Sequence, residues 1–272
     1  MSSTCLFKCF CPTWLWRCWL QYEKSVGDKQ SPIDIRRKTV LQDPSLNKTT
    51  LQWSNTGLRC THLLNTGRGW EVSVAAPGPN LRGGPLAYNY QLAQFHGHWS
   101  NSIAHGSEHT VDGEHYAGEL HLVHYNADRY KSLAEATFAE EGLQVVGVFL
   151  KEGSLHPEVG KIVDCLSNVI YKGQKCALEQ HLDVTSFIPE RSSYWTYEGS
   201  LTSPPWSENV TWIVYKEAIE VSLQQLQAFQ KLTSHSETIL APRDGFIVKN
   251  TRGTQPLRDR VVREPLDELA PF

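Results

Sequence analysis

The chain has 272 residues, of which 40% are hydrophobic, 20% charged and 10% aromatic, and this is enough material for a sizeable core. The balance excludes an intrinsically disordered, collagen-like or coiled-coil protein. Lys and Arg number 26 against 29 Asp and Glu, so the formal charge of -3 argues against a general nucleic-acid binder.

The first 24 residues form a leader rich in Trp and Cys. Lys8 and Arg17 interrupt its apolar residues, so we expect neither a stable membrane span nor a signal peptide, and we expect the leader to be disordered or a targeting segment. The chain has 7 cysteines, an odd number, and no Cys-x-x-Cys pair, which favours a reducing compartment over a disulfide framework. We therefore expect a cytoplasmic location, with the mitochondrion as the alternative.

From Gln30 onward, short segments alternate with turn residues, as is typical of a β-rich protein. Alternating, aromatic or β-branched residues predict strands at 71–74, 94–99, 119–125, 143–150 and 210–214. Strong breakers lie between some of these segments, namely Pro77-Gly78-Pro79-Asn80, Gly83-Gly84-Pro85 and Ser203-Pro204-Pro205. Helical patterns are few and short, at 128–140, 157–166 and 222–232, the last with Ser222 as a plausible cap.

No linker interrupts residues 30–263, so we expect one domain over residues 25–263, of a mainly β (α+β) class. The expected architecture is a large, twisted, mostly antiparallel central sheet with short helices around it. The acidic, proline-containing segment 264–272 is expected to be a frayed C-terminal tail.

Seven of the eleven histidines lie between residues 96 and 124. Side chains at i and i+2 of a strand share a face, so His96 and His98 should project together. His121 shares a face of the next predicted strand with Glu119 and Val123, and pairing of the polar faces would bring it to the first two histidines. Three neutral imidazoles leave a fourth position open, which is typical of a catalytic Zn2+ site. Histidines whose hydrogen bonds are satisfied within a sheet wall are the alternative.

Two polar residues precede these histidines at the same spacing. Gln94 lies two residues before His96, and Glu119 lies two residues before His121. Each can accept the second ring N–H of its neighbour and so fix the tautomer of a metal ligand.

Four long motifs resemble the α-class carbonic anhydrases, and the match extends in order from about Gln30 to Arg260. The motifs are Gln30-Ser31-Pro32-Ile33-Asp34-Ile35, Ser107-Glu108-His109-Thr110-Val111-Asp112-Gly113, Glu119-Leu120-His121-Leu122-Val123-His124 and Tyr194-Trp195-Thr196-Tyr197-Glu198-Gly199-Ser200-Leu201-Thr202-Ser203-Pro204-Pro205. The resemblance implies a zinc lyase that reversibly hydrates carbon dioxide to bicarbonate and a proton, with ester hydrolysis as a side activity. It also implies a monomer inhibited by sulfonamides and small anions.

The same resemblance implies roles for single residues. His96, His98 and His121 match the zinc ligands, and Gln94 and Glu119 match the residues that hold them. Thr202 matches the threonine that accepts a hydrogen bond from zinc-bound hydroxide, and Glu108 matches the carboxylate that accepts the threonine proton. The residues matching the substrate pocket are Val123, Val145, Leu201, Ser203, Val210 and Trp212.

Two departures from the family pattern concern the site. Arg68 occupies the usual position of the proton-shuttle histidine, and His62 is a further candidate for proton transfer. Gly97 replaces a large aromatic between the first two ligands, so we expect empty space beneath them and a stabilising Gly97→Phe. If neighbours fill that space, overpacking would cost about 1–3 kcal/mol instead. A catalytically weak or silent binding module and a structural-zinc or storage protein remain the alternatives to an active enzyme.

Overall fold

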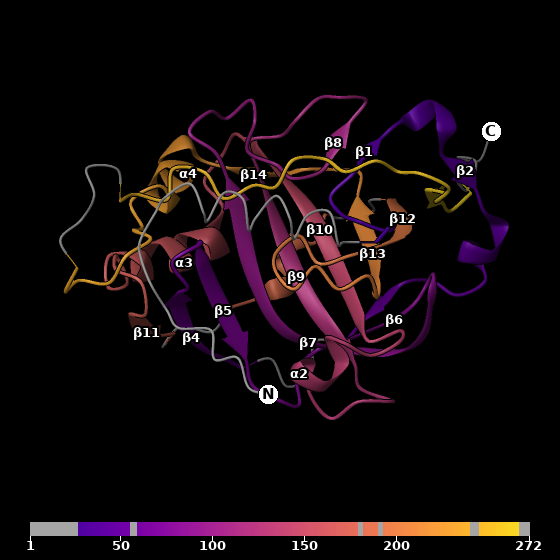
Figure 1. Ribbon diagram of the computed structural model, residues 1–272, viewed down its shortest axis with the longest axis horizontal. Helices are drawn as coiled ribbons and strands as arrows, with labels where there is room; N and C mark the ends of the chain where they lie inside the picture. Colours follow the sequence, from indigo (N-terminus) through magenta and orange to yellow (C-terminus); the bar gives the residue numbers. More distant parts are fainter. Residues whose placement is uncertain (1–26, 55–58, 179–181, 190–192, 240–244, 267–272) are drawn as a thin grey trace, which may run out of the picture.

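The computed structural model describes residues 27–54, 59–178, 182–189, 193–239 and 245–266 (Figure 1). The leader at 1–24 lies outside these described residues. A sheet of 13 strands dominates the described part of the chain, and β1 (Asp34–Ile35) pairs with β8 (Thr110–Val111) in a separate two-stranded sheet. The predicted mainly β fold is therefore confirmed.

The remaining strands run through the chain with these bounds: β2 (Leu41–Gln42), β3 (Gln52–Trp53), β4 (Cys60–Asn65), β5 (Trp70–Val74), β6 (Asn80–Gly83), β7 (Leu86–Trp99), β9 (Gly118–Asn126), β10 (Leu143–Glu152), β11 (Lys175–Ala177), β12 (Tyr194–Gly199), β13 (Val210–Tyr215), β14 (Ile219–Val221) and β15 (Arg263–Glu264). The helices are η1 (Arg37–Thr39), η2 (Pro44–Asn47), α2 (Leu133–Ala136), α3 (Pro157–Leu166), η3 (Val184–Phe187) and α4 (Leu223–Phe229). All five predicted strands are present, and β7 extends well beyond its predicted start.

The large sheet has the strand order β11-β4-β5-β7-β9-β10-β13-β12-β15-β2, with β3, β6 and β14 attached beside it. Most neighbours are antiparallel, as predicted. However, β10 pairs in parallel with both β13 and β14, and β15 pairs in parallel with β2. The sheet is therefore mixed, with a parallel junction beside its centre.

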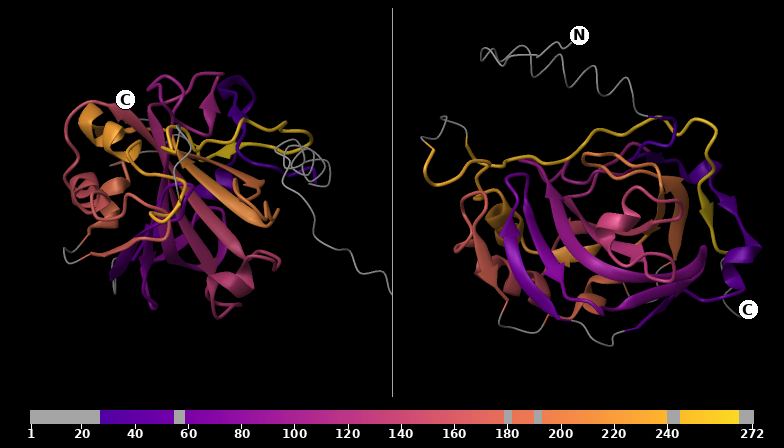
Figure 2. Two further views of the ribbon diagram at one scale, coloured as in Figure 1. Left: turned by 60° about the vertical axis from the view of Figure 1, so that its left-hand side comes forward. Right: turned by 60° about the horizontal axis from the view of Figure 1, so that its bottom comes forward.

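The centre of the sheet is buried on both faces, including the polar residues of β9. Every residue of β9 and the first eight of β10 are buried. One apolar cluster, which includes residues of α3 and α4, lies on the side of Phe95 and Leu122. A second cluster contains Val145 and Trp212. The two views of Figure 2 show the curvature of this sheet, with α3 and α4 grouped at one end.

Two of the three predicted helices form. α3 has the predicted bounds, and α4 begins after Ser222, whose hydroxyl accepts the Gln225 N–H while the Gln225 side chain accepts the Ser222 N–H. The helix predicted at 128–140 is wrong, because only α2 is helical there. α2 begins only after its cap Ser132, and at and beyond its end the Asn209 amide donates to the carbonyls of residues 136, 137 and 139.

The C-terminal segment, yellow in Figure 1, crosses the molecule and rejoins the sheet at β15. Glu264, where we expected the tail to begin, lies in this strand and accepts hydrogen bonds from Trp195 and Lys216. Among the described helices, none has the length and apolar character needed to cross a bilayer.

Candidate active site and metal centre

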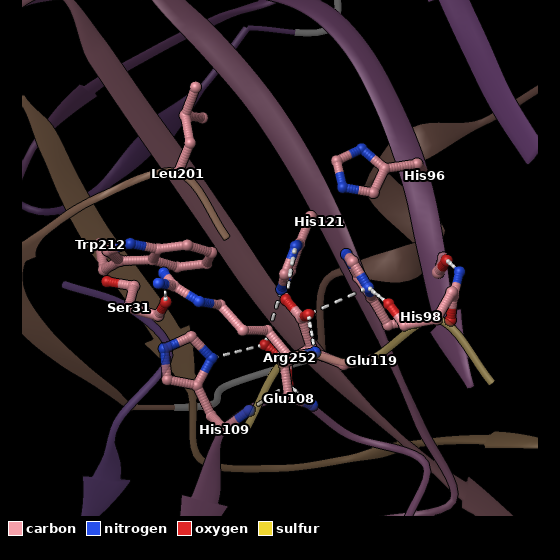
Figure 3. A network of polar contacts seen from close by, with 12 residues as sticks. Ser31, His96, His98, Glu108, His109, Glu119, His121, Leu201, Trp212 and Arg252 are labelled. Carbon is pink, nitrogen blue, oxygen red and sulfur yellow. Dashed lines mark hydrogen bonds and ion pairs between the residues drawn. The ribbon is translucent and has the colours of Figure 1, made fainter. Parts of the chain in front are cut away.

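Pairing of β7 with β9 brings the three predicted histidines together, as the sequence indicated. His96 lies directly opposite His121 in the antiparallel register, and His98 follows on the same face of β7. Their ring centroids are separated by 4.4–5.3 Å. One ring nitrogen of each histidine lies within 4.8 Å of the others. Figure 3 shows the three imidazoles gathered at one place on the sheet.

Acceptors fix the tautomers of the two histidines on β7. His96 Nδ1 lies 2.8 Å from Gln94 Oε1, as predicted, and His98 Nδ1 lies 3.1 Å from the carbonyl oxygen of Asn250. Because these oxygens only accept, each Nδ1 carries the hydrogen and each Nε2 keeps its lone pair. His98 Nε2 is buried and has no hydrogen-bond partner among the described residues. An unpartnered buried lone pair of this kind fits a metal ligand.

Burial keeps these two imidazoles neutral. It lowers the pKa of His96 well below its ordinary value, and the neighbouring His98 and His121 lower it further. Burial also lowers the pKa of His98, against the opposing effect of Glu108. Neutral imidazoles are the form that ligates metals.

The third histidine is held by a buried carboxylate. His121 Nε2 lies 2.8 Å from Glu119 Oε1, so its Nδ1 is the nitrogen left for a metal. Glu119 also accepts the backbone N–H groups of Glu108 and His109 and the side-chain N–H of His109. Burial alone would raise the pKa of Glu119, but His109 and His121 hold it well below its ordinary value. The carboxylate is therefore charged.

A chain of hydrogen bonds continues behind Glu119. Because His109 donates from Nδ1, its Nε2 accepts from the Tyr197 hydroxyl at 2.7 Å. The Tyr197 oxygen then accepts from Ser31 Oγ at 2.8 Å, and Ser31 Oγ accepts the Ser200 N–H. These hydrogen bonds connect His121 on β9, through Glu119, to the segment that precedes β1.

Glu108 lies beside the histidines with one oxygen uncommitted. Its Oε1 accepts the Arg252 N–H at 2.7 Å, whereas its Oε2 is buried and has no hydrogen-bond partner among the described residues. The Arg252 guanidinium donates to Gln30 Oε1 and to the Ser31 carbonyl, and this fixes the backbone that binds Glu108. No hydrogen bond joins Thr202 to Glu108 in the described part of the chain.

A cavity of about 700 Å³ opens over His96 and His98, whereas His121 is not among the residues that line it. Seven of the predicted site residues line it: Arg68, Gln94, His96, His98, Glu108, Thr202 and Ser203. The predicted apolar residues lie instead in the buried cluster beside it, where Val123, Val145, Val210 and Trp212 pack together and Leu201 packs against them. The Trp212 ring lies 4.9 Å from that of His121, so this cluster borders the metal centre from the β10–β13 side.

The space predicted beneath Gly97 does not exist. A Cβ placed on Gly97 would lie 2.6 Å from Trp70 Cζ2, well inside van der Waals contact. Trp70, on β5, is only 1% exposed and packs against Phe95 and Phe229. The expectation of a stabilising Gly97→Phe is therefore wrong, and the overpacking alternative applies because the indole fills the position of the family's aromatic.

Arg68 lies in the turn between β4 and β5 and lines the cavity, as expected of the shuttle position. His62, the other residue considered for proton transfer, lies on β4 and contacts Thr61, and it does not line this cavity. Sequence analysis missed the roles of Asn250 and Arg252. The Asn250 carbonyl accepts from His98 while its side chain bonds to the backbone of Gly97 and Trp99. The Arg252 N–H binds Glu108 while its guanidinium binds Gln30 and Ser31.

His109 and Tyr197 belong to the quoted motifs, yet only their contacts in the folded chain reveal what they do. In the sequence, only their position within the family motifs indicates that these two residues are functional.

A mixed sheet that brings three acceptor-oriented imidazoles together beside a cavity defines a candidate metal centre in a protein of mainly β architecture. The family described as eukaryotic-type carbonic anhydrase matches residues 14–265, and the chain belongs to this family of enzymes. Carbonic anhydrase 1 of Oryctolagus cuniculus is 40% identical over 238 residues, which cover 87% of this chain and 99% of that protein. Carbonic anhydrase 5B, mitochondrial, of Mus musculus is 42% identical over 239 residues, which cover 87% of this chain and 74% of that protein.

Proposed function

We propose that this protein reversibly hydrates carbon dioxide to bicarbonate and a proton, with Zn2+ held by His96 Nε2, His98 Nε2 and His121 Nδ1. The convergence of three lone pairs, one of them buried and unpartnered, carries the proposal. Imidazole nitrogens suit zinc, and three of them leave a position open for the reaction. Zinc bound there would lower the pKa of a water molecule and so supply a nucleophile near neutral pH.

Glu108 and Thr202 would orient the reacting oxygen. The uncommitted Glu108 Oε2 can only accept a hydrogen bond, so the Thr202 hydroxyl would donate to it. The Thr202 oxygen would then accept a hydrogen bond from the nucleophile and aim it at the substrate. Both residues line the cavity above the histidines, which supports this assignment.

The buried cluster beside His121 would supply an apolar surface for carbon dioxide. Val123 and Trp212 flank Val145 in the sheet register, and all three are almost fully buried. An uncharged, apolar substrate gains from such contacts, whereas bicarbonate does not. Leu201 and Val210 extend this surface, and Ser203 adds a hydroxyl at the cavity.

The remaining properties follow from the same assignment. We propose ester hydrolysis as a side activity, inhibition by sulfonamides and small anions, and a monomeric protein. One relative is named as mitochondrial. For this chain we propose the cytoplasm, with the mitochondrion as the alternative.

Metal analysis combined with stopped-flow hydration tests the proposal. The purified protein should bind one equivalent of zinc and hydrate carbon dioxide, and His121→Ala should lose both properties. His105→Ala, which changes an exposed histidine outside the cavity, should keep both. Full hydration activity in zinc-free His121→Ala, or bound zinc without any hydration in the wild type, would contradict the proposal.

A further inference from the structure

Two cations line the mouth of the cavity on adjoining segments of the chain. Arg68 lies in the β4–β5 turn, and Lys249 lies in the C-terminal segment. Gly69 packs closely against the Asn250 side chain, because a Cβ added to Gly69 would lie 2.8 Å from Asn250 Nδ2. The β4–β5 turn and the C-terminal segment are therefore in contact next to Arg68 and Lys249. Because the Asn250 carbonyl binds His98, this contact places Arg68 and Lys249 on the same cavity as the metal centre.

A third cation lies against the same turn. A Cβ on Gly67 would lie 2.6 Å from Lys172 Cδ, so the Lys172 side chain extends over the turn next to Arg68. Among the described residues, neither lysine nor Arg68 takes part in an ion pair. These three side chains are called the basic mouth below.

No ion pair joins the acidic residues of the cavity to the basic mouth in the described part of the chain. Glu108 lies deep in the cavity, where the Arg252 N–H binds one of its oxygens. Glu71 lies opposite His96 on β5, and no ion pair joins it to a cation in the described part of the chain. Among the described residues, Arg68 and Lys249 therefore line the cavity without an ion-pair partner, although the Glu71 side chain lines the same cavity.

We propose that this pocket selects ligands that carry a carboxylate at the end remote from the histidines, with Arg68 and Lys249 binding that carboxylate. The inference rests on the proposed function, because the metal would anchor the other end of the ligand. The planar guanidinium of Arg68 can bind both carboxylate oxygens, and Lys249 adds a second charge. Two exposed ion pairs should improve affinity by about threefold to tenfold at low salt, and salt should reduce the gain.

The test compares two probes of nearly the same shape in the zinc-loaded protein, 4-sulfamoylbenzoate and its neutral amide, 4-sulfamoylbenzamide. Calorimetry gives the dissociation constant of each at low and at high salt. We expect the carboxylate to bind about threefold to tenfold more tightly at low salt. Arg68→Gln combined with Lys249→Gln should remove this preference and leave the affinity for the amide unchanged. Lys48→Gln, an exposed lysine outside the cavity, removes one charge as a control and should keep the preference.

Equal affinity of the wild type for the two probes would overturn the inference and leave the proposed function intact. A preference that persists in the double variant would also overturn it, because Arg68 and Lys249 would then not be its source. Failure of both probes to bind zinc-loaded protein would instead count against the proposed function itself, and the inference would fall with it.

Discussion

The close contact between Gly97 and Trp70 predicts that β7, which carries His96 and His98, cannot accept a larger residue at position 97 without a loss of stability. In Gly97→Ala, the added Cβ would lie 2.6 Å from Trp70 Cζ2 and 3.1 Å from Cε2. Overpacking of this kind costs about 1–3 kcal/mol. Replacing glycine in a strand returns about 0.5–1 kcal/mol of backbone entropy. We therefore expect the free energy of unfolding to fall by up to about 2.5 kcal/mol, with a central value of about 1 kcal/mol. Zinc should be released faster to a chelator because His96 and His98 flank the residue.

Urea denaturation and chelator-driven zinc release measure the two effects. Trp70→Leu removes the obstructing ring atoms, so in the double variant Gly97→Ala should cost less than it does alone, with a coupling energy of about 0.5–3 kcal/mol. Gly160→Ala is the matched control, since its Cβ would meet only Gln225 Nε2 at 3.7 Å. That helix substitution should stabilise the protein by about 0.5–1 kcal/mol. A Gly97→Ala protein more stable than the wild type, or strict additivity with Trp70→Leu, would refute this account of the packing.

Three further predictions concern the site. Arg68→His should raise turnover in weak buffer and leave kcat/KM nearly unchanged, because arginine cannot relay a proton; wild-type turnover indifferent to added imidazole would contradict this. Tyr197→Phe should leave buried His109 Nε2 without a hydrogen-bond donor and so lower the free energy of unfolding in urea by about 1–3 kcal/mol. An unchanged urea midpoint would count against this series of hydrogen bonds. Glu119→Gln should weaken zinc binding about 10-fold to 100-fold in chelator competition, because it disturbs the His121 tautomer; wild-type affinity would exclude that role.

Local patterns predicted much of the fold and the heart of the site. The period of two on a strand put His96 and His98 on one face, and the spacing of Glu119 from His121 identified its acceptor. The alternation of turn residues and short apolar runs predicted a β-rich domain. The capping residue Ser222 fixed the start of α4. Each of these signals depends on neighbours along the chain, so a single sequence contains it.

The features that were missed depend on residues distant in the sequence. The helix predicted at 128–140 forms only over Leu133–Ala136, and Asn209 binds the carbonyls at its end, a contact that no local pattern encodes. The space beside Gly97 is filled by the indole of Trp70 on the neighbouring strand β5. The side-chain volume that glycine lacks is therefore provided by a residue elsewhere in the sequence. The acceptor of His98 is the Asn250 carbonyl, and the Asn250 side chain holds it there by hydrogen bonds to the backbone of Gly97 and Trp99 on a distant segment. Such complementarity becomes visible only when the strands have been placed side by side.

The acceptors that complete the site also determine when it can form during synthesis. His98 depends on the Asn250 carbonyl across 152 positions of sequence, and Arg252 reaches Glu108 across 144 and Gln30 across 222. Contacts of such long range form late, after the loops between them have closed. A chain still emerging from the ribosome therefore presents its histidines before their orienting partners have been made. Acquisition of a tightly held metal should follow release of the whole chain, and bound metal then reports that both ends of the protein have folded together.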